Sequence, residues 1–373
     1  MHPRPDITTL CCVNPECKLY GLKNQANLRI RKEYGRDRIR YLRCCACAEE
    51  FSERRNTALF NSKIPEERAV SVIEHYDYGN SLEATAKLTR VSKDTASRLL
   101  RRTGRICQKL HDTLVQGVES ACLQFDEKWS YVGKKQKRLT SDDPSEFGDR
   151  WDLNAIDAQT KLLVSVRMGK RTAENIHALV QDAASRLSSR TPRPAIFTDG
   201  ESGYIEAIRQ AFGRRYSVPR QGVRGPQPKP IFRIPYDLVY AQVIKHRKGS
   251  RIEKVEVRPI FGKGKLAGVL ARLGWNQANT SAIERFNLTD RCRNSRKVRR
   301  TLSFSKQVRF HDWMGYLSAV TYNFCHTHRS LKLPLATRKY LHRTPAMAAG
   351  LASVRWQTID VLRYVALSWD NLR

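Results

Sequence analysis

Two clusters of closely spaced cysteines near the start of the chain restrict its fold more than any other feature of the sequence. The first cluster runs from Cys11 to Cys17 and the second from Cys44 to Cys47. The stretch 28–42 between them is basic and partly alternating, which predicts a short hairpin. Two pairs of thiolates on tight turns complete a tetrahedral zinc site, as in a zinc ribbon. A unit this small has little apolar core, so metal binding would supply about 10 kcal/mol of its folding free energy.

Each cluster contains a cysteine doublet, so the choice of zinc ligands has alternatives. The best pairing uses four residues: Cys12 with Cys17, and Cys44 with Cys47. Cys11 and Cys45 compete with their neighbours, and loop cysteines without any metal are the further alternative. The chain starts without an apolar signal-peptide core, so we expect a reducing, intracellular environment. Ten cysteines in that environment favour metal ligands over disulfides.

The charge of the chain indicates a polyanionic partner. Its 68 lysines and arginines outnumber 36 aspartates and glutamates, which gives a net charge of +32 and a pI near 10.1. DNA or RNA relieves such self-repulsion, because neutralised phosphates release their counterions. An unusually basic soluble protein and an anionic-membrane binder are the alternatives. No apolar run approaches the roughly 18 residues of a membrane span, so we expect no membrane partner.

Residues 62–112 have the pattern of a helix-turn-helix DNA-binding domain. A first helix stops at Gly79-Asn80, and a short helix over 81–89 follows. After a turn at Arg90-Val91, Ser92 can cap a new helix. That last helix would present five side chains to DNA: Lys93, Thr95, Arg98, Arg101 and Arg102. A three-helix packing unit that binds no DNA is the alternative.

Residues 118–335 predict an α/β domain with an RNase H-like order of elements. Alternation around Asp126 predicts a strand over 122–132, which is followed by a hairpin over 151–168 and a helix over 172–187. A buried strand over 194–200 and a helix over 202–212 come next. In that fold the first and fourth strands are neighbours, so Asp126 and Asp199 are expected to meet in space.

Residues 218–274 are interpreted as an insertion into this domain. Prolines and glycines over 218–230 predict a surface loop, and renewed alternation over 237–261 predicts a hairpin that turns at Lys248-Gly249-Ser250. We interpret 262–274 as a basic connector. A helix that starts near Asn279 would then bring Glu284 to the two aspartates.

Three carboxylates, Asp126, Asp199 and Glu284, are what metal-dependent phosphoryl transfer on DNA requires. They can hold two Mg²⁺ or Mn²⁺ ions about 3.5–4 Å apart. Each has an alternative interpretation. Asp126 could be a solvated strand residue with Glu127 as its rival, and Asp199 could be a turn residue. Glu284 could only close a helix N-terminus in a capping box with Ser281.

Cations are dense after Glu284 and are expected to contact the DNA backbone near the cleaved phosphate. They are Arg285, Arg291, Arg293, Arg296, Lys297, Arg299 and Arg300. A solvated helix face is the alternative. Trp129 and Tyr131 could stack on a base, with core packing as the equal alternative. His311 could contact a phosphate, and a surface histidine is the simpler interpretation.

Taken together, the motifs resemble those of IS-one-type bacterial insertion-sequence transposases, members of the DDE transposase superfamily. The matching segments are CVNPEC, RCCAC, FDEKWSYVGKK, IFTDG, NTSAIERFNLTDR and TLSFSKQVRFHD, within a resemblance that covers residues 10–350. It implies that Asp126, Asp199 and Glu284 are the catalytic triad of an RNase H-like domain. The segment 218–274 departs from the pattern by being longer than expected.

The resemblance implies metal-dependent cleavage and strand transfer, with transposon-end and target DNA as partners and a homodimer or higher oligomer in the DNA complex. It also implies a prokaryotic cytoplasmic, nucleoid-associated protein. A DNA-binding regulator derived from a transposase, and a nuclease of the same fold that joins no strands, are the alternatives. We expect four parts: a zinc ribbon (8–56), the helix-turn-helix domain (62–112), the catalytic domain (118–335) and a helical C-terminal tail (336–373).

Overall fold

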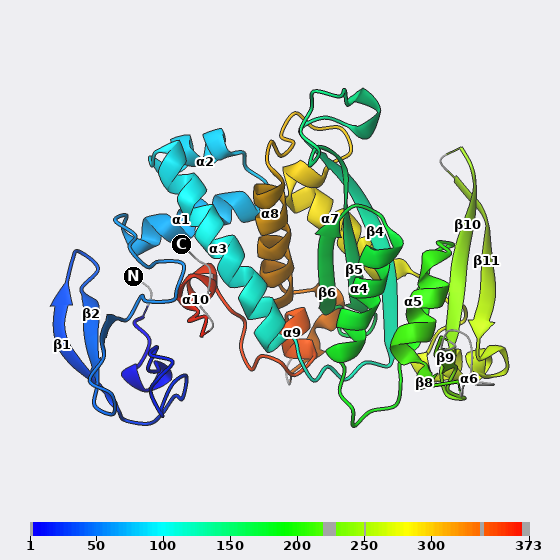
Figure 1. Cartoon of the computed structure of the whole chain (residues 1–373), viewed down its shortest axis with the longest axis horizontal. Helices are drawn as coiled ribbons and strands as arrows, with labels where there is room; N and C mark the ends of the chain where they lie inside the picture. The colour runs from blue at the N-terminus through cyan, green and yellow to red at the C-terminus, as the bar shows by residue number, and fades with distance from the viewer. Residues whose placement is uncertain (1–2, 219–228, 250, 336–338, 368–373) are drawn as a thin grey trace, which may run out of the picture.

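The computed structural model describes residues 3–218, 229–249, 251–335 and 339–367. Along its longest axis, Figure 1 shows a small cysteine-rich sheet, then a group of helices, then a large sheet with helices on both faces. Within the described ranges, no helix is long and apolar enough to cross a membrane.

The N-terminal part is a three-stranded antiparallel sheet in the order β1-β2-β3. Its strands are β1 (Leu28–Tyr34), β2 (Ile39–Cys44) and β3 (Glu50–Ser52). The hairpin predicted between the two cysteine clusters is therefore confirmed. Among the described residues, its buried apolar cluster contains Leu28, Leu42 and Phe51 beside Val13 and the cysteines, with a few half-buried side chains such as Val365 packed against it. So small a core needs a further source of stability, as the sequence predicts.

Three helices follow, namely α1 (Glu66–Asp77), α2 (Leu82–Thr89) and α3 (Lys93–Leu114). Ser81 caps α2 by accepting from the amide of Ala84, and Ser92 caps α3 by accepting from the amide of Thr95, both at 3.1 Å. Between them Arg90 adopts a left-handed conformation that turns the chain. The third helix runs well beyond the predicted DNA-contacting residues, to Leu114.

The large sheet has six strands in the order β11-β10-β7-β4-β5-β6. The strands are β4 (Cys122–Val132), β5 (Gly148–Asp157), β6 (Leu163–Gly169), β7 (Ala195–Thr198), β10 (Tyr240–Lys248) and β11 (Arg251–Phe261). The first and fourth predicted strands are neighbours, because β4 pairs with β7 in parallel. The hairpin predicted over 237–261 is confirmed as β10 and β11.

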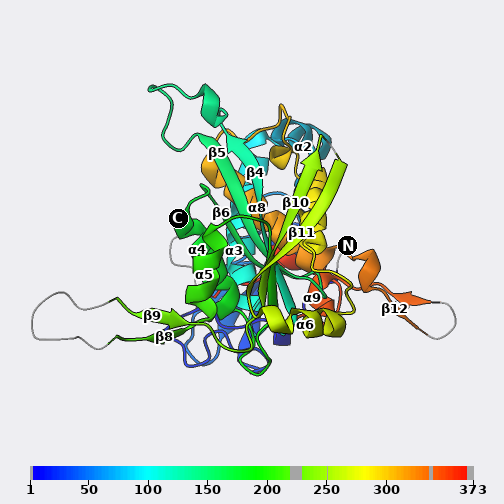
Figure 2. The same ribbon diagram turned by 90° about the vertical axis from the view of Figure 1, so that its right-hand side faces the viewer.

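Helices cover both faces of this sheet, as Figures 1 and 2 show. Alternation along β4 sends Leu123 and Phe125 into the apolar cluster shared with α4 (Ala173–Ser185) and α5 (Gly203–Phe212). On the other face, Cys122 joins a second cluster with α7 (Ser281–Arg293). The sheet is thus the middle of three layers, and the side chains of β4 reach both outer layers.

The segment between β7 and α7 differs in part from its interpretation as an insertion. Residues 262–274 are wrongly interpreted as a connector, since they contain a short 3-10 turn (Lys263–Lys265) and the helix α6 (Leu266–Leu273). The predicted surface loop lies mostly outside the described residues. Its described flanks form a two-stranded ribbon of β8 (Arg214–Tyr216) and β9 (Ile231–Arg233), which projects from the body in Figure 2.

The C-terminal part contains α8 (Val308–Val320) with a π-helical end (Thr321–Cys325), the strands β12 (Leu333–Pro334) and β13 (Tyr340–Leu341), and the helices α9 (Pro345–Ala348) and α10 (Thr358–Arg363). Helix α8 packs along α3, and one continuous apolar cluster joins α1, α3, α8, α9 and α10 to the sheet. The three N-terminal helices and the α/β layers therefore share one core.

The contact between α3 and α8 is close because α3 carries a glycine where it faces Trp313. A Cβ added to Gly104 would lie 2.3 Å from the Cβ and 2.8 Å from the Cα of Trp313. We predict that Gly104→Ala lowers the free energy of unfolding by about 1–3 kcal/mol, because the backbones of the helices must separate.

The matched control is Gly268→Ala in α6, where an added Cβ meets nothing within 4 Å. Alanine favours the helix there and is expected to raise the free energy of unfolding by about 0.5–1 kcal/mol. Urea denaturation of the two variants measures both effects. Equal effects at the two positions would contradict the close packing of α3 on α8.

Candidate active site and zinc centre

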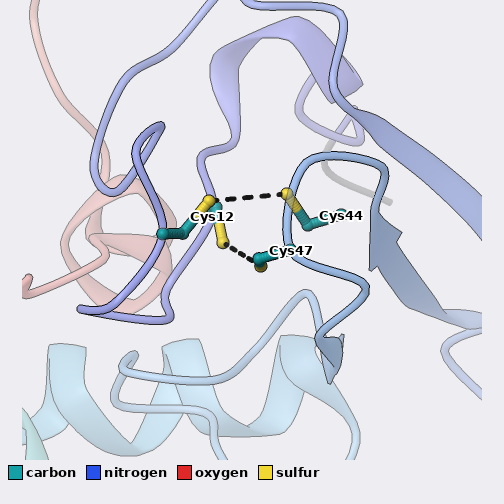
Figure 3. A group of neighbouring side chains, drawn as sticks. Cys12, Cys44 and Cys47 are labelled. Carbon is teal, nitrogen blue, oxygen red and sulfur yellow. Dashed lines mark hydrogen bonds between the residues drawn. The ribbon is translucent and has the colours of Figure 1, made fainter.

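Four cysteines converge at the base of the N-terminal sheet. The Sγ atoms of Cys12, Cys17, Cys44 and Cys47 all lie within 4.8 Å of one another. Figure 3 shows Cys12, Cys44 and Cys47 pointing toward one another from two loops. The distance is 3.7 Å between the sulfurs of Cys12 and Cys47, and 3.9 Å between those of Cys17 and Cys44. These are the four ligands chosen from the sequence.

The sulfur cluster fits a tetrahedral zinc ion. Zinc–sulfur bonds of about 2.3 Å imply sulfur–sulfur distances of roughly 3.8 Å in a tetrahedron. The side-chain amide of Asn27 donates to the Cys44 sulfur at 3.1 Å, and the Leu19 amide donates to the Cys17 sulfur at 3.4 Å. Such N–H donors stabilise thiolate ligands. The rival cysteines lie outside the cluster, with Cys11 buried elsewhere and Cys45 exposed.

Asp126 and Asp199 meet at the edge where β7 ends. The last paired residues of the two strands are Phe125 and Thr198, so each aspartate is the next residue along its strand. Carboxylate oxygens of Asp126, Glu127 and Asp199 all lie within 4.8 Å of one another. The predicted meeting of the two aspartates is therefore confirmed. Glu127, considered from the sequence only as a rival to Asp126, joins them.

Glu284 borders this group without belonging to it. It lies in the first turn of α7, where its Oε1 accepts from the Thr280 hydroxyl at 2.5 Å and pairs with the Lys245 ammonium. Its negative charge contributes to raising the pKa of both aspartates, so the three acids share one electrostatic environment.

The helix that carries Glu284 is anchored to β4 by a side chain. Gln124 accepts from the amides of Ala282 and Ile283 with its Oε1, both at 3.0 Å, and donates to the Asn279 carbonyl at 2.8 Å. The predicted capping box with Ser281 is wrong, because Thr280 is the N-cap residue and Gln124 satisfies the first amides. The start of α7 is thus anchored to β4 at Gln124, two positions before Asp126.

Asn287 holds the first aspartate, and it was missed by sequence reasoning. It lies one turn after Glu284, and its Nδ2 donates to Asp126 Oδ2 at 2.8 Å while its Oδ1 accepts from Asn154 at 3.1 Å. The three-residue spacing from Glu284 on a predicted helix is the signal that could have identified it.

Burial and the charges of neighbouring carboxylates raise the pKa values of the acids. Burial raises the pKa of Asp126 to about 6, and the nearby charge of Asp199 adds to the rise. Burial likewise raises the pKa of Glu127 to about 7, again with a contribution from Asp199. The pKa of Asp199 is also raised by burial. Three adjacent carboxylates with disfavoured charge are the ligand set that a hard divalent cation accepts.

A buried network of charges lies behind the acids on the α7 face. Lys128 pairs with Asp152 at 3.1 Å and with Asp290 of α7, while Lys297 donates to Asp152 at 2.6 Å and to His311 at 2.7 Å. Burial lowers the pKa of Lys128 to about 8 and lowers that of His311 well below its usual value. The network joins β4, β5, α7 and α8.

Two sequence interpretations are corrected by this network. His311 is fully buried rather than at the surface, and its Nδ1 contacts the Ser305 hydroxyl at 3.1 Å. Lys297 is fully buried as well, so its ammonium has no access to DNA. Helix α7 ends at Arg293, so the later cations lie in the 3-10 turn Ser295–Lys297 and beyond.

The remaining cations after Glu284 fall into two groups. Arg285, Arg299 and Arg300 are exposed. Arg291 is half-buried and interacts electrostatically with Asp126. Arg293 and Arg296 instead lie over the rings of Tyr78 and Tyr76 at 5.4 and 5.9 Å. The first group leads from the acids to the surface, whereas the second packs α1 against the α/β layers.

The residues of α3 that are predicted to face DNA differ in their exposure to solvent. Lys93 and Arg98 are exposed, and the Arg98 guanidinium lies 3.5 Å from the Thr95 hydroxyl. Arg101 is half-buried, and Arg102 donates to the Phe60 carbonyl. The start of α3 therefore presents exposed polar side chains, although Lys93 pairs with Glu83 at 3.3 Å. Arg102 is occupied within the protein.

The aromatic pair beside the site is mostly packed. Tyr131 is buried, stacks on Phe304 with ring centroids 5.3 Å apart and lies 5.8 Å from Trp129. Trp129 is half-buried, and the Lys135 ammonium lies 5.6 Å from its ring centroid. Of the two rings, Trp129 has the exposed surface.

Comparisons with known proteins identify no family for the chain. No model of a known protein family matches it, and no curated protein matches it either. Among solved structures, the Mos1 strand transfer complex is similar with 13% identity, 40% of this chain covered and a TM-score of 0.17. The Mos1 mariner paired end complex with Mn has 14% identity, 40% coverage and a TM-score of 0.18.

The piggyBac transposase synaptic complex with hairpin DNA is similar over more of the chain. Its identity is 12% and its TM-score 0.26, with 69% of this chain and 71% of that chain covered. The chain spans just over half of the two Mos1 chains, 55% and 56% of their lengths. With TM-scores this low, we base the functional argument on the residues of this chain.

The cysteine geometry generates a prediction for zinc. We expect the purified chain to hold one zinc ion, and Cys44→Ser to lose it because a tetrahedral site needs all four thiolates. Metal analysis by mass spectrometry measures the zinc content, and chelation should unfold the N-terminal sheet. The adjacent Cys45→Ser is the matched control and should keep its zinc. A full zinc content in Cys44→Ser would refute the site.

Proposed function

We propose that the chain is a DDE-type DNA transposase that binds transposon ends and catalyses metal-dependent DNA cleavage and strand transfer. The observation that carries this proposal is the convergence of Asp126 and Asp199 at the end of β7, beside Glu284 at the start of α7. The sheet order, the motif resemblance and the net charge of +32 support the same conclusion. The domain is assigned to the RNase H-like class on the same grounds.

Divalent cations fit the acid group, because the Oε1 atom of Glu127 is buried beside the aspartates without a hydrogen-bond partner. We assign Asp126, Asp199 and Glu284 as residues that would hold Mg²⁺ or Mn²⁺. When bound, such ions supply Lewis acidity and an activated hydroxyl or water for attack on a phosphodiester. Asn287 keeps the Asp126 carboxylate in one orientation, with a hydrogen bond to one of its two oxygens.

The surrounding cations would bind the DNA backbone. Arg291, Arg299 and Arg300 extend from the neighbourhood of Asp126 to the surface, where they can neutralise phosphates close to the cleaved bond. Lys245 pairs with Glu284, and its ammonium would be available to a phosphate if Glu284 held a divalent cation. Trp129 offers a partly exposed ring for stacking on an unpaired base.

We assign the N-terminal parts to recognition of the transposon end. Lys93, Thr95 and Arg98 at the start of α3 would reach base edges and phosphates, as in a helix-turn-helix module. The zinc ribbon adds a basic hairpin beside it. Two transposon ends must be joined in one reaction, so a dimer or larger oligomer of the chain is expected on DNA.

The catalytic assignment is tested with Asp199→Asn. We predict loss of DNA cleavage and joining by more than about 100-fold with Mg²⁺ or Mn²⁺, because even partners outside the ligand shell contribute roughly 10–100-fold. The substrate is DNA carrying the inverted repeats that flank the gene, and gels resolve nicked from joined products.

Asp237→Asn is the control, because Asp237 is an exposed acid that pairs with Arg193 away from the site. Full activity of Asp199→Asn would refute the triad. Cleaved but never joined DNA from the unaltered chain would replace the proposal with a nuclease. Binding of the ends without any cleavage would replace it with a regulator.

The electrostatic part of the proposal predicts how DNA binding depends on salt. Affinity should fall steeply with salt, and removing the charges of Arg299 and Arg300 together should reduce the slope of log affinity against log salt by about two. Fluorescence anisotropy with labelled duplex measures the slope. Arg272→Gln on exposed α6 is the control and should leave the slope unchanged. An unchanged slope in the double variant would exclude these arginines from the DNA interface.

A further inference from the structure

Glu127 is buried at the edge of the sheet beside the candidate triad. It is 9% exposed, and its Oε1 is a buried atom without a hydrogen-bond partner. Its Oε2 lies 3.7 Å from the Arg171 guanidinium, which also contacts Glu201 and lies over the Trp151 ring at 5.2 Å. An ionised carboxylate in such a place lacks the hydrogen bonds that normally compensate its burial.

The direction of the Glu127 side chain sets it apart from Asp126. Neighbouring residues of a strand point to opposite faces, so Asp126 faces Asn287 of α7 while Glu127 faces the side of Tyr204 on α5. Their oxygens nevertheless lie within 4.8 Å of each other and of Asp199. Asp199 directly follows the last residue of β7, Thr198, at this edge of the sheet.

The groups around Glu127 do not explain its burial. The Tyr204 hydroxyl faces the Glu127 carboxyl and lowers its pKa, but neither this hydroxyl nor Oε1 of Glu127 has a partner in full hydrogen-bond geometry. Arg171 contributes one charge, at a distance longer than a hydrogen bond, and it is shared with Glu201. A carboxylate kept as a structural ion pair would instead have both oxygens satisfied. The unpartnered oxygen therefore indicates a ligand that the polypeptide itself does not supply.

We propose that Glu127 is a fourth carboxylate ligand of the divalent-cation site, reaching it from the α5 face while Glu284 reaches it from the α7 face. The inference rests on the proposed function and extends it by one residue. Asp126 and Asp199 lie between the two glutamates and can be shared by two cations, one on each side of the sheet edge. Glu127 then determines cation binding on a face where the triad supplies no residue of its own.

The test measures Mn²⁺ binding to the full chain by electron paramagnetic resonance, without DNA. Glu127→Gln keeps the shape of the side chain but removes its charge, and we expect the Mn²⁺ affinity of its site to fall at least about tenfold. Glu201→Gln is the matched control, because it removes the other acid that contacts Arg171. It should change the affinity far less, which separates direct ligation from an effect through Arg171.

Each outcome decides between the alternatives. Unchanged Mn²⁺ affinity in Glu127→Gln would overturn the inference, as would an equal loss in Glu201→Gln. If Glu127→Gln does not fold, Glu127→Asp keeps the charge but withdraws it by one methylene, and wild-type affinity there would also overturn the inference. Asp126→Asn reports on the proposed function separately. Unchanged binding in Asp126→Asn refutes the whole metal site, whereas loss there with none in Glu127→Gln refutes only the role of Glu127.

Discussion

The pairing of Lys128 with Asp152 and Asp290 is the interaction on which the candidate site depends most. These residues come from β4, β5 and α7, and Lys297 adds a second ammonium from the turn after α7. All four are nearly completely buried, so removal of any one would leave a charge unpaired at a cost of about 3–5 kcal/mol. The network therefore fixes α7 against the strand that carries Asp126. Because Asn287 and Glu284 lie on the same helix, the network also fixes their positions relative to Asp126. A site for metal ions needs such rigidity, because ligand geometry tolerates little displacement.

Much of this architecture was predictable from local patterns. Alternation identified β4, and helical spacing with capping serines identified α2 and α3, since these signals lie within a few neighbouring residues. Cysteine spacing selected the four thiolates, because tetrahedral coordination allows few arrangements of two turns. The order of strands placed Asp126 beside Asp199. Each of these predictions uses a constraint that is either local or imposed by the common topology of α/β sheets.

The residues that sequence reasoning missed are defined by contacts across long separations. Lys128 meets Asp290 over 162 positions and Asn287 meets Asp126 over 161, and no local pattern reports such pairs. Lys297 and His311 have residue types that usually lie at the surface, so their burial follows only from the partners that surround them. From the sequence, Glu127 is only a rival to Asp126, because alternation sends neighbouring strand residues to opposite faces and does not indicate that both join one group of acids. The Glu127 carboxylate also lies near Asp199, which directly follows the end of β7, and the end of a short strand is poorly predicted from sequence.

The segment around α10 packs against the N-terminal part of the chain. Arg363 binds the Glu66 carboxylate through two nitrogens at 2.7 Å each, across 297 positions. The Ala366 amide donates to the Asn56 carbonyl at 3.0 Å, and Val365 packs on the apolar cluster of the N-terminal sheet. During translation the N-terminal sheet and α1 therefore leave the ribosome long before the residues that hold them in place. The N-terminal sheet and helices reach their final arrangement only after the clustered acids Asp126, Glu127 and Asp199 have also been synthesised. A chain that ended before Arg363 would lack the contact with Glu66 that holds α1 and the N-terminal sheet in place.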